Sequence, residues 1–140
     1  MVFSNSQSGT PDDTAPFLAG STKIVIVFVN GSGDDWEGDD YDDLQYMWLE
    51  IQKAANWMKS QAPNGADVSF IQGYYVASTD YDPASDSSWT WSEDAIENLG
   101  FSDTDGDGKR IDEMLNFNKN YEGADNAVAI FVPHIEGRAH

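Results

Sequence analysis

Two unbroken apolar runs predict the most buried strands of this protein. The first covers residues 24–29 ("IVIVFV") and the second covers residues 127–132 ("AVAIFV"). Runs of this length, rich in β-branched residues, are typical of parallel strands that helices cover on both faces. Between them, the segment "ADVSFIQGYYVAS" at residues 66–78 alternates its side chains between two faces, which predicts a third strand.

Helical periodicity separates the predicted strands. Within residues 44–62, apolar side chains recur at steps of three and four, which predicts an amphipathic helix of about five turns. Its apolar positions are Leu44, Met47, Trp48, Ile51, Ala55, Met58 and Ala62. Residues 89–101 predict a shorter helix with Ser92 as its N-cap and Gly100 as its stop. Residues 109–123 predict a third helix, with one side formed by Ile111, Met114, Leu115 and Asn118.

This order of elements predicts an α/β fold of two or three layers. A βαβ unit, right-handed as such units are, is followed by two short helices and a last strand, and the mainly parallel sheet has three or more strands. A chain of 140 residues suits one domain. Residues 1–21 are rich in Ser, Thr, Gly, Pro and Asp and show no periodicity, so we expect a flexible leader or linker there and a single domain at residues 22–140.

The charge of the chain narrows the range of partners. The chain has only 7 Lys and Arg residues but 25 Asp and Glu residues, and its formal net charge is -18. Such a molecule is repelled by nucleic acids and anionic membrane surfaces, so we expect no nucleic-acid partner. No apolar run approaches the roughly 20 residues of a membrane span, so we expect no membrane insertion. The absence of cysteine excludes disulfides, thiolate zinc sites and a cysteine nucleophile.

Several landmarks resemble the N-terminal part of metzincin-like secreted zinc metallopeptidase domains. They are the stretches "IQKAANWMKSQAPNGADVSF", "WTWSEDAIENLGF" and "NKNYEGADNAVAIFVPHIEGRAH". In that family, a Trp-containing helix ends in Ala-Pro before a strand that closes on Ser-Phe. A later Gly-Ala-Asp precedes an apolar strand, and a "GRA" segment follows shortly before the zinc helix. The resemblance runs from about Lys23 to the C-terminus and implies an exported, extracellular or cell-surface protein.

The zinc-binding motif of that family is missing from this chain. Metzincins bind zinc through a His-Glu-x-x-His helix, in which two imidazoles one turn apart share the metal. The two histidines here, His134 and His140, lack that spacing. The resemblance therefore implies a chain truncated before the catalytic residues, with zinc bound only if the missing part were present. The tetrapeptide "IEGR" at residues 135–138 is also a recognition site of a tag-removing protease, which leaves its native origin open.

The stretch "DTDGDGKRIDEM" is the clearest candidate metal site. An EF-hand-type loop takes oxygen ligands at positions 1, 3, 5, 7, 9 and 12 and has Gly at position 6. With Asp103 at position 1, Asp105 and Asp107 fall at positions 3 and 5 and Gly108 at position 6, whereas position 12 is Met114. A shifted loop that recruits Asp112 would complete a calcium site of Asp103, Asp105, Asp107 and Asp112.

The alternative for these aspartates is an acidic turn that caps the following helix, partly neutralised by Lys109 and Arg110. Two function hypotheses follow from the sequence. The chain is either the inactive N-terminal portion of an exported zinc metallopeptidase-like domain, or a calcium-binding extracellular module without catalytic residues. In the calcium-binding module, an aromatic surface or a sheet edge could meet a protein, peptide or sugar. In the truncated domain, a sheet edge that the missing part would cover predicts self-association.

Overall fold

The computed structural model describes residues 2–5, 20–31, 36, 41–63 and 67–135. Its elements, in chain order, are β1 (Val2–Asn5), β2 (Gly20–Asn30), α1 (Tyr41–Ser60), β3 (Val68–Ser78), α2 (Ser88–Asn98), α3 (Arg110–Glu122) and β4 (Asn126–Pro133). The predicted α/β class and the predicted order of strands and helices from β2 onwards are confirmed. None of the described helices is both long enough and apolar enough to cross a membrane.

The four strands form one sheet in the order β1-β4-β2-β3. Central strand β2 runs parallel to both of its neighbours and pairs Val27 with Tyr75 on one side and with Phe131 on the other. Strand β1 pairs antiparallel with β4. A flexible leader was expected over residues 1–21, but residues 2–5 form strand β1 at the edge of the sheet. Residues 6–19 of the expected leader lie outside the described residues.

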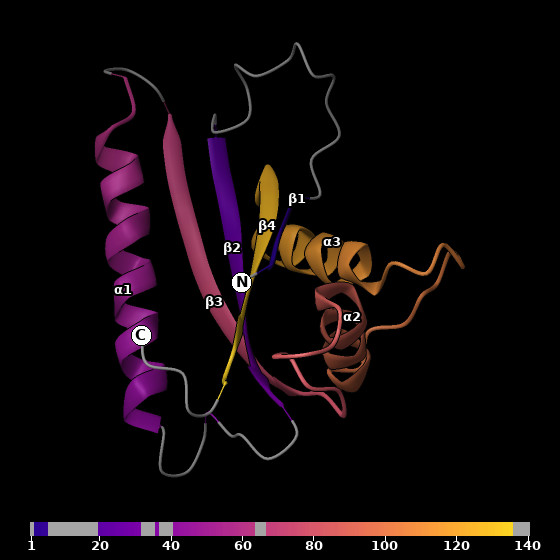
Figure 1. The fold of residues 1–140 in the computed structure, drawn as a ribbon. Coiled ribbons are helices and arrows are strands. Elements are labelled where there is room, and N and C mark those ends of the chain that lie inside the picture. Colours follow the sequence, from indigo (N-terminus) through magenta and orange to yellow (C-terminus); the bar gives the residue numbers. More distant parts are fainter. Residues whose placement is uncertain (1, 6–19, 32–35, 37–40, 64–66, 136–140) are drawn as a thin grey trace.

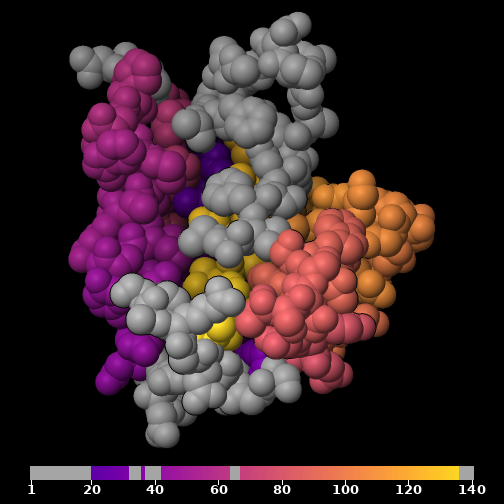
Figure 2. Space-filling model, in the orientation of Figure 1, coloured from indigo at the N-terminus to yellow at the C-terminus, as the bar shows by residue number. Residues whose placement is uncertain are grey.

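Helices cover both faces of the sheet, which gives three layers. Figure 1 shows α1 on one side of the strands and α2 with α3 on the other. The side chains of β2 alternate accordingly: Ile24, Ile26 and Phe28 pack in the cluster with α1, whereas Val25 and Val27 pack with α2 and α3. In the space-filling view of Figure 2, part of β4 (yellow) is visible between these two helical layers.

The periodicity predicted for α1 is confirmed from Leu44 to Ala55, whereas Met58 is exposed and Ala62 lies beyond the end of the helix. Leu44 and Ala55 are buried, and Met47, Trp48 and Ile51 pack against the same core cluster. The helix begins at Tyr41, and its first turn carries Asp42 and Asp43, where negative side chains suit the positive end of the helix dipole.

Helix α2 begins earlier than the sequence predicted. Its N-cap is Ser87, whose side chain accepts a hydrogen bond from the Thr90 amide. The prediction that Ser92 caps this helix was wrong, because Ser92 lies buried within the helix and donates to the Trp89 carbonyl. The earlier start places Trp91 in the core, where its ring contacts Phe131 of β4.

The starts of β2 and β4 are held together by one aspartate. Asp125, just before β4, accepts a hydrogen bond from the Ser21 amide at 2.9 Å. Gly20 has a φ of 83°, and a side chain there would collide with the Asp125 carboxylate. Glycine is therefore required both by the backbone conformation and by the close approach of Asp125.

Candidate metal site

The acidic loop between α2 and α3 projects from the body of the molecule, as Figure 1 shows at the side away from α1. Two of its glycines, Gly106 and Gly108, have φ values of 73° and 78°. Such values are strained for residues with a side chain, so these glycines let the loop turn back within a few residues. Gly108 is the turn glycine that the EF-hand comparison predicted.

Asp103 organises the interior of this loop. Its Oδ1 accepts a hydrogen bond from the Asp107 amide at 3.1 Å, and its Oδ2 accepts one from the Gly108 amide at 2.7 Å. The same Asp107 amide is 3.2 Å from Asp105 Oδ1. These bonds curl the chain around the two carboxylates and hold both of them on the inner side of the turn.

Glu113, in the first turn of α3, closes the loop from the other side. Its Oε1 accepts hydrogen bonds from the Thr104 amide at 3.0 Å and from the Thr104 hydroxyl at 2.7 Å. As a result, one carboxylate oxygen each from Asp103, Asp105 and Glu113 lie within 4.8 Å of one another. Asp105 is exposed, and Asp103 and Glu113 are half-buried. The three carboxylates form what we call the metal cluster.

Two of the four sequence-predicted ligands lie in the metal cluster. Asp103 and Asp105 are members, whereas the structure does not bring Asp107 or Asp112 into it. Asp107 instead accepts a hydrogen bond from the Lys109 amide at 2.8 Å. Glu113 was not predicted as a ligand, because it occupies position 11 of the loop, one residue before the position that normally supplies the last ligand.

The competing role for the aspartates, capping of α3, is filled by another residue. Buried Glu93 of α2 accepts hydrogen bonds from the Arg110 amide at 2.8 Å and the Ile111 amide at 3.3 Å. The Arg110 guanidinium is also directed to α2, where it lies 3.6 Å from Glu97. Since Glu93 satisfies these amides, the metal cluster is not needed to cap the helix, and Arg110 is engaged elsewhere.

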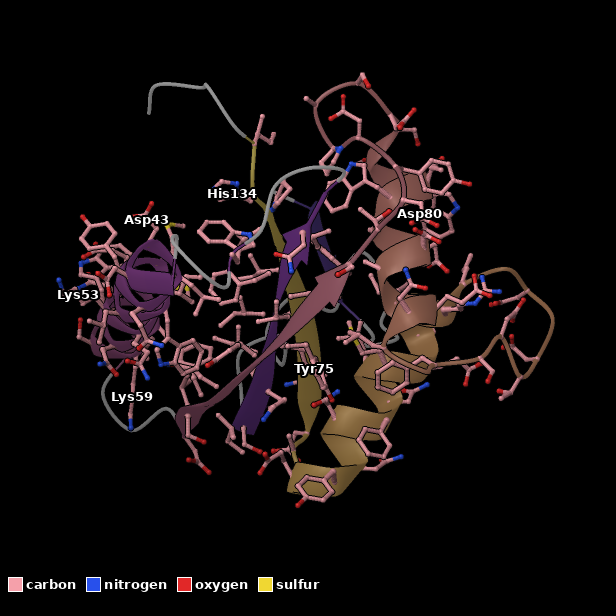
Figure 3. All side chains as sticks on the ribbon, turned by 90° about the horizontal axis from the view of Figure 1, so that it is seen from below. Asp43, Lys53, Lys59, Tyr75, Asp80 and His134 are labelled. Atoms are coloured by element: carbon pink, nitrogen blue, oxygen red, sulfur yellow. The ribbon has the colours of Figure 1, made fainter. Side chains whose placement is uncertain are left out.

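Lys109 belongs to the loop itself, whereas two other lysines lie far from it. Lys53 and Lys59 are on α1, on the opposite side of the sheet (Figure 3). Lys53 is paired within its own helix: a hydrogen bond from its ammonium to Glu50, 2.8 Å long, together with the charge of that carboxylate, raises the pKa of Lys53 above its ordinary value. Lys53 and Lys59 therefore neutralise little of the negative charge of the metal cluster.

The histidines give no zinc site within the described part of the chain. His134 lies against the ring of Trp36, at 4.8 Å between ring centroids, and Trp36 itself donates to the Val132 carbonyl. His140 and most of the "IEGR" segment lie outside the described residues. The metal cluster contains carboxylates alone, and oxygen ligands suit calcium or magnesium better than zinc.

The chain was compared with protein-family models, with curated protein sequences and with solved structures, and no match was found in any of the three.

Proposed function

We propose that this protein is a calcium-binding α/β module, in which one ion orders the loop between α2 and α3. The observation that carries the proposal is the convergence of Asp103, Asp105 and Glu113, whose carboxylate oxygens lie within 4.8 Å of one another. Three negative charges at this separation repel one another without a cation. A divalent cation would convert that repulsion into attraction.

The ligand chemistry favours calcium over magnesium. Calcium accepts six to eight oxygens in a flexible geometry, and an exposed site with three carboxylates leaves room for water and backbone oxygens. Magnesium demands near-ideal octahedral geometry and usually keeps several waters with only one or two carboxylates. The exposed position of Asp105 indicates a weak site, of the kind that extracellular modules use at about 10⁻⁴–10⁻³ M calcium. A site of this kind would suit an extracellular location.

The role of the ion is structural. Glu113 belongs to α3, whereas Asp103 and Asp105 belong to the preceding loop, so a bound ion would fasten the loop to the first turn of the helix. Helix α3 packs Met114 and Leu115 into the core. Calcium binding would therefore stabilise the whole domain, because the bound ion favours the folded over the unfolded chain.

Isothermal titration calorimetry of chelator-treated protein tests this proposal. We expect one calcium per chain, with magnesium binding at least tenfold more weakly. Glu113→Gln should remove the heat of binding, whereas the matched substitution Glu50→Gln on α1 should leave it unchanged. Absence of calcium binding at millimolar concentrations, or equal binding by both variants, would refute a site at the metal cluster.

As a second candidate function, we propose the N-terminal portion of an exported zinc metallopeptidase-like domain that is not catalytic as given. What supports it is the position of the landmark residues. Helix α1 is followed by Ala62 and Pro63 before β3, and the Gly-Ala-Asp at residues 123–125 directly precedes β4. The test is the coding sequence beyond codon 140, which this proposal requires to continue into a His-Glu-x-x-His helix.

Self-association through the sheet belongs to this second proposal. Among the described strands, β3 has a neighbour on one side only, so its other edge has no paired strand. An edge strand of 11 residues can pair with a strand of a second molecule. Light scattering over a range of concentrations tests the idea, and a mass that stays monomeric at the highest concentration would contradict it.

A further inference from the structure

A pocket of about 340 Å³ lies where β3 meets α3, on the face of the sheet opposite α1. It is lined by Lys23, Gly73, Tyr74, Tyr75, Phe117, Asn118, Tyr121 and Glu122. None of these residues belongs to the metal cluster. The pocket combines an ion pair, in which Lys23 is buried and Glu122 is exposed, with aromatic rings, and this combination indicates what kind of ligand fits it.

The polar part of the pocket is the ion pair between Lys23 and Glu122. The ammonium of Lys23 lies 2.8 Å from Glu122 Oε1, and only 6% of Lys23 is exposed. Gly73 makes room for this ammonium: a side-chain carbon at residue 73 would lie 2.8 Å from Lys23 Nζ. A glycine in the middle of a strand is unfavourable, and here it keeps the pocket open beside a buried charge.

The apolar part of the pocket is formed by α3. Phe117 and Tyr121 are one helical turn apart, and their rings stack with centroids 6.1 Å apart and planes 18° apart. Both rings are largely exposed, at 55% and 81%. Together they place two exposed aromatic rings in the lining of the pocket, beside the ion pair. Exposed aromatic side chains gathered around a pocket are typical of binding sites.

Tyr75 and Asn118 fix the inner wall between sheet and helix. The Tyr75 hydroxyl is 3.2 Å from Asn118 Nδ2, and Asn118 also donates to the Met114 carbonyl at 2.9 Å. Figure 3 shows Tyr75 on the side of the sheet that faces α3. The ring of Tyr74, in contrast, packs against Trp48 and Phe28 on the opposite face. The wall is thus held in place before any ligand enters.

We propose that this pocket binds a neutral saccharide. Because Glu122 already balances the charge of Lys23, the ion pair offers an anion no net positive charge, and the protein's charge of -18 repels anions at longer range. A sugar hydroxyl suits the pair, since it can accept a hydrogen bond from Lys23 while it donates one to Glu122. The C–H groups of a sugar ring carry partial positive charge and pack on the electron-rich faces of aromatic rings such as Tyr121.

Titration with neutral hexasaccharides of glucose, mannose, xylose and N-acetylglucosamine, followed by two-dimensional NMR of the whole chain, tests this inference. We expect at least one of them to bind and to shift the amide signals around Gly73 and Tyr121. Tyr121→Ala should weaken that binding at least tenfold, and Gly73→Val should abolish it by filling the pocket. Tyr46→Ala, which removes another exposed tyrosine, 62% accessible and on α1, should change it less than twofold.

Three results would overturn the inference. One is the absence of binding by all the neutral sugars. Another is tighter binding of an oligogalacturonide, which is anionic, or of an extended peptide. The third is sugar binding that Tyr121→Ala and Tyr46→Ala affect equally. Because the pocket shares no residue with the metal cluster, calorimetry with calcium gives an independent result for the proposed function.

Discussion

Replacing Asp105 with asparagine removes one negative charge from the metal cluster while keeping the shape of the side chain. Asp105 Oδ1 is 3.2 Å from the Asp107 amide, and an asparagine carbonyl oxygen can accept the same hydrogen bond. The substitution therefore separates the effect of charge from that of loop geometry. Asp103 is less suitable, because both of its carboxylate oxygens accept bonds from backbone amides.

Without calcium, Asp105→Asn should stabilise the protein. In the wild type, Asp105 faces Asp103 and Glu113, with carboxylate oxygens within 4.8 Å. Two unit charges at such a distance repel by about 1 kcal/mol in water, and physiological salt screens roughly half of this energy. Removing both repulsions should raise the free energy of unfolding by about 1 kcal/mol. For a domain of this size, that corresponds to an increase in Tm of about 3–4 °C.

With calcium, the order of stability should reverse. At a hundredfold excess of calcium over its Kd, binding stabilises the wild type by about 2.7 kcal/mol, or about 10 °C in Tm. Asp105→Asn lacks one of three carboxylate ligands and should bind far more weakly. The variant is therefore expected to be more stable than the wild type in chelator and less stable in calcium.

Differential scanning calorimetry of both proteins measures this reversal, in chelator and in calcium at about a hundredfold excess over Kd, which is roughly 10–100 mM for the affinity proposed above, at matched ionic strength. Sodium chloride controls for screening, which alone relieves repulsion in so acidic a chain. Asp112→Asn is the matched variant, since Asp112 lies in the first turn of α3 but outside the metal cluster. It should retain the full calcium-dependent rise in Tm. An equal rise in wild type and Asp105→Asn would refute the reasoning.

Three further substitutions test the scaffold around the site. Glu93→Gln should lower the free energy of unfolding by about 1–3 kcal/mol in urea titrations, because it weakens the buried cap of α3; a loss below about 0.5 kcal/mol would contradict that role. Gly20→Ala should lower it by at least 1 kcal/mol, because alanine is strained at a φ of 83° and meets Asp125; an unchanged urea midpoint would count against this close approach. Leu115→Ala should cost about 2–5 kcal/mol, because Leu115 is fully buried, whereas Leu49→Ala, at an exposed position, should cost much less; similar losses would contradict the assigned core.

The central strands and α1 could be predicted from sequence because their environments leave a local pattern. A strand covered on both faces is apolar over most of its length, and β2 is apolar from Ile24 to Val29 within the stretch that is buried from Thr22 to Val29. Helix α1 has one buried side, so its apolar residues recur with the helical period. These patterns do not depend on which distant segment supplies the contacts.

Features that depend on distant contacts could not be predicted. Strand β1 has four residues and is defined by its pairing with β4, more than 120 residues away, so its short sequence carries no recognisable period. The cap of α2 was predicted at Ser92 alone, although Ser87 fits the capping rule as well. What separates them is the burial of Trp91, which depends on the fold.

The candidate site was predictable only in part, because some of its residues form a local pattern and others are brought in by distant contacts. Asp103 and Asp105 follow a recognisable loop spacing, whereas Glu113 joins them only because α3 begins at Arg110 and turns that side chain toward Thr104. The ion pair of Lys23 and Glu122 joins residues 99 positions apart. Neither arrangement is encoded in a short motif.

A crystal structure of the protein grown in millimolar calcium, with anomalous diffraction data, tests the central claim most directly. The account predicts one anomalous peak between Asp103, Asp105 and Glu113, with carboxylate oxygens at about 2.3–2.6 Å from the ion. It would be contradicted by a calcium-saturated crystal in which these three carboxylates surround only water, or in which the peak lies elsewhere on the molecule.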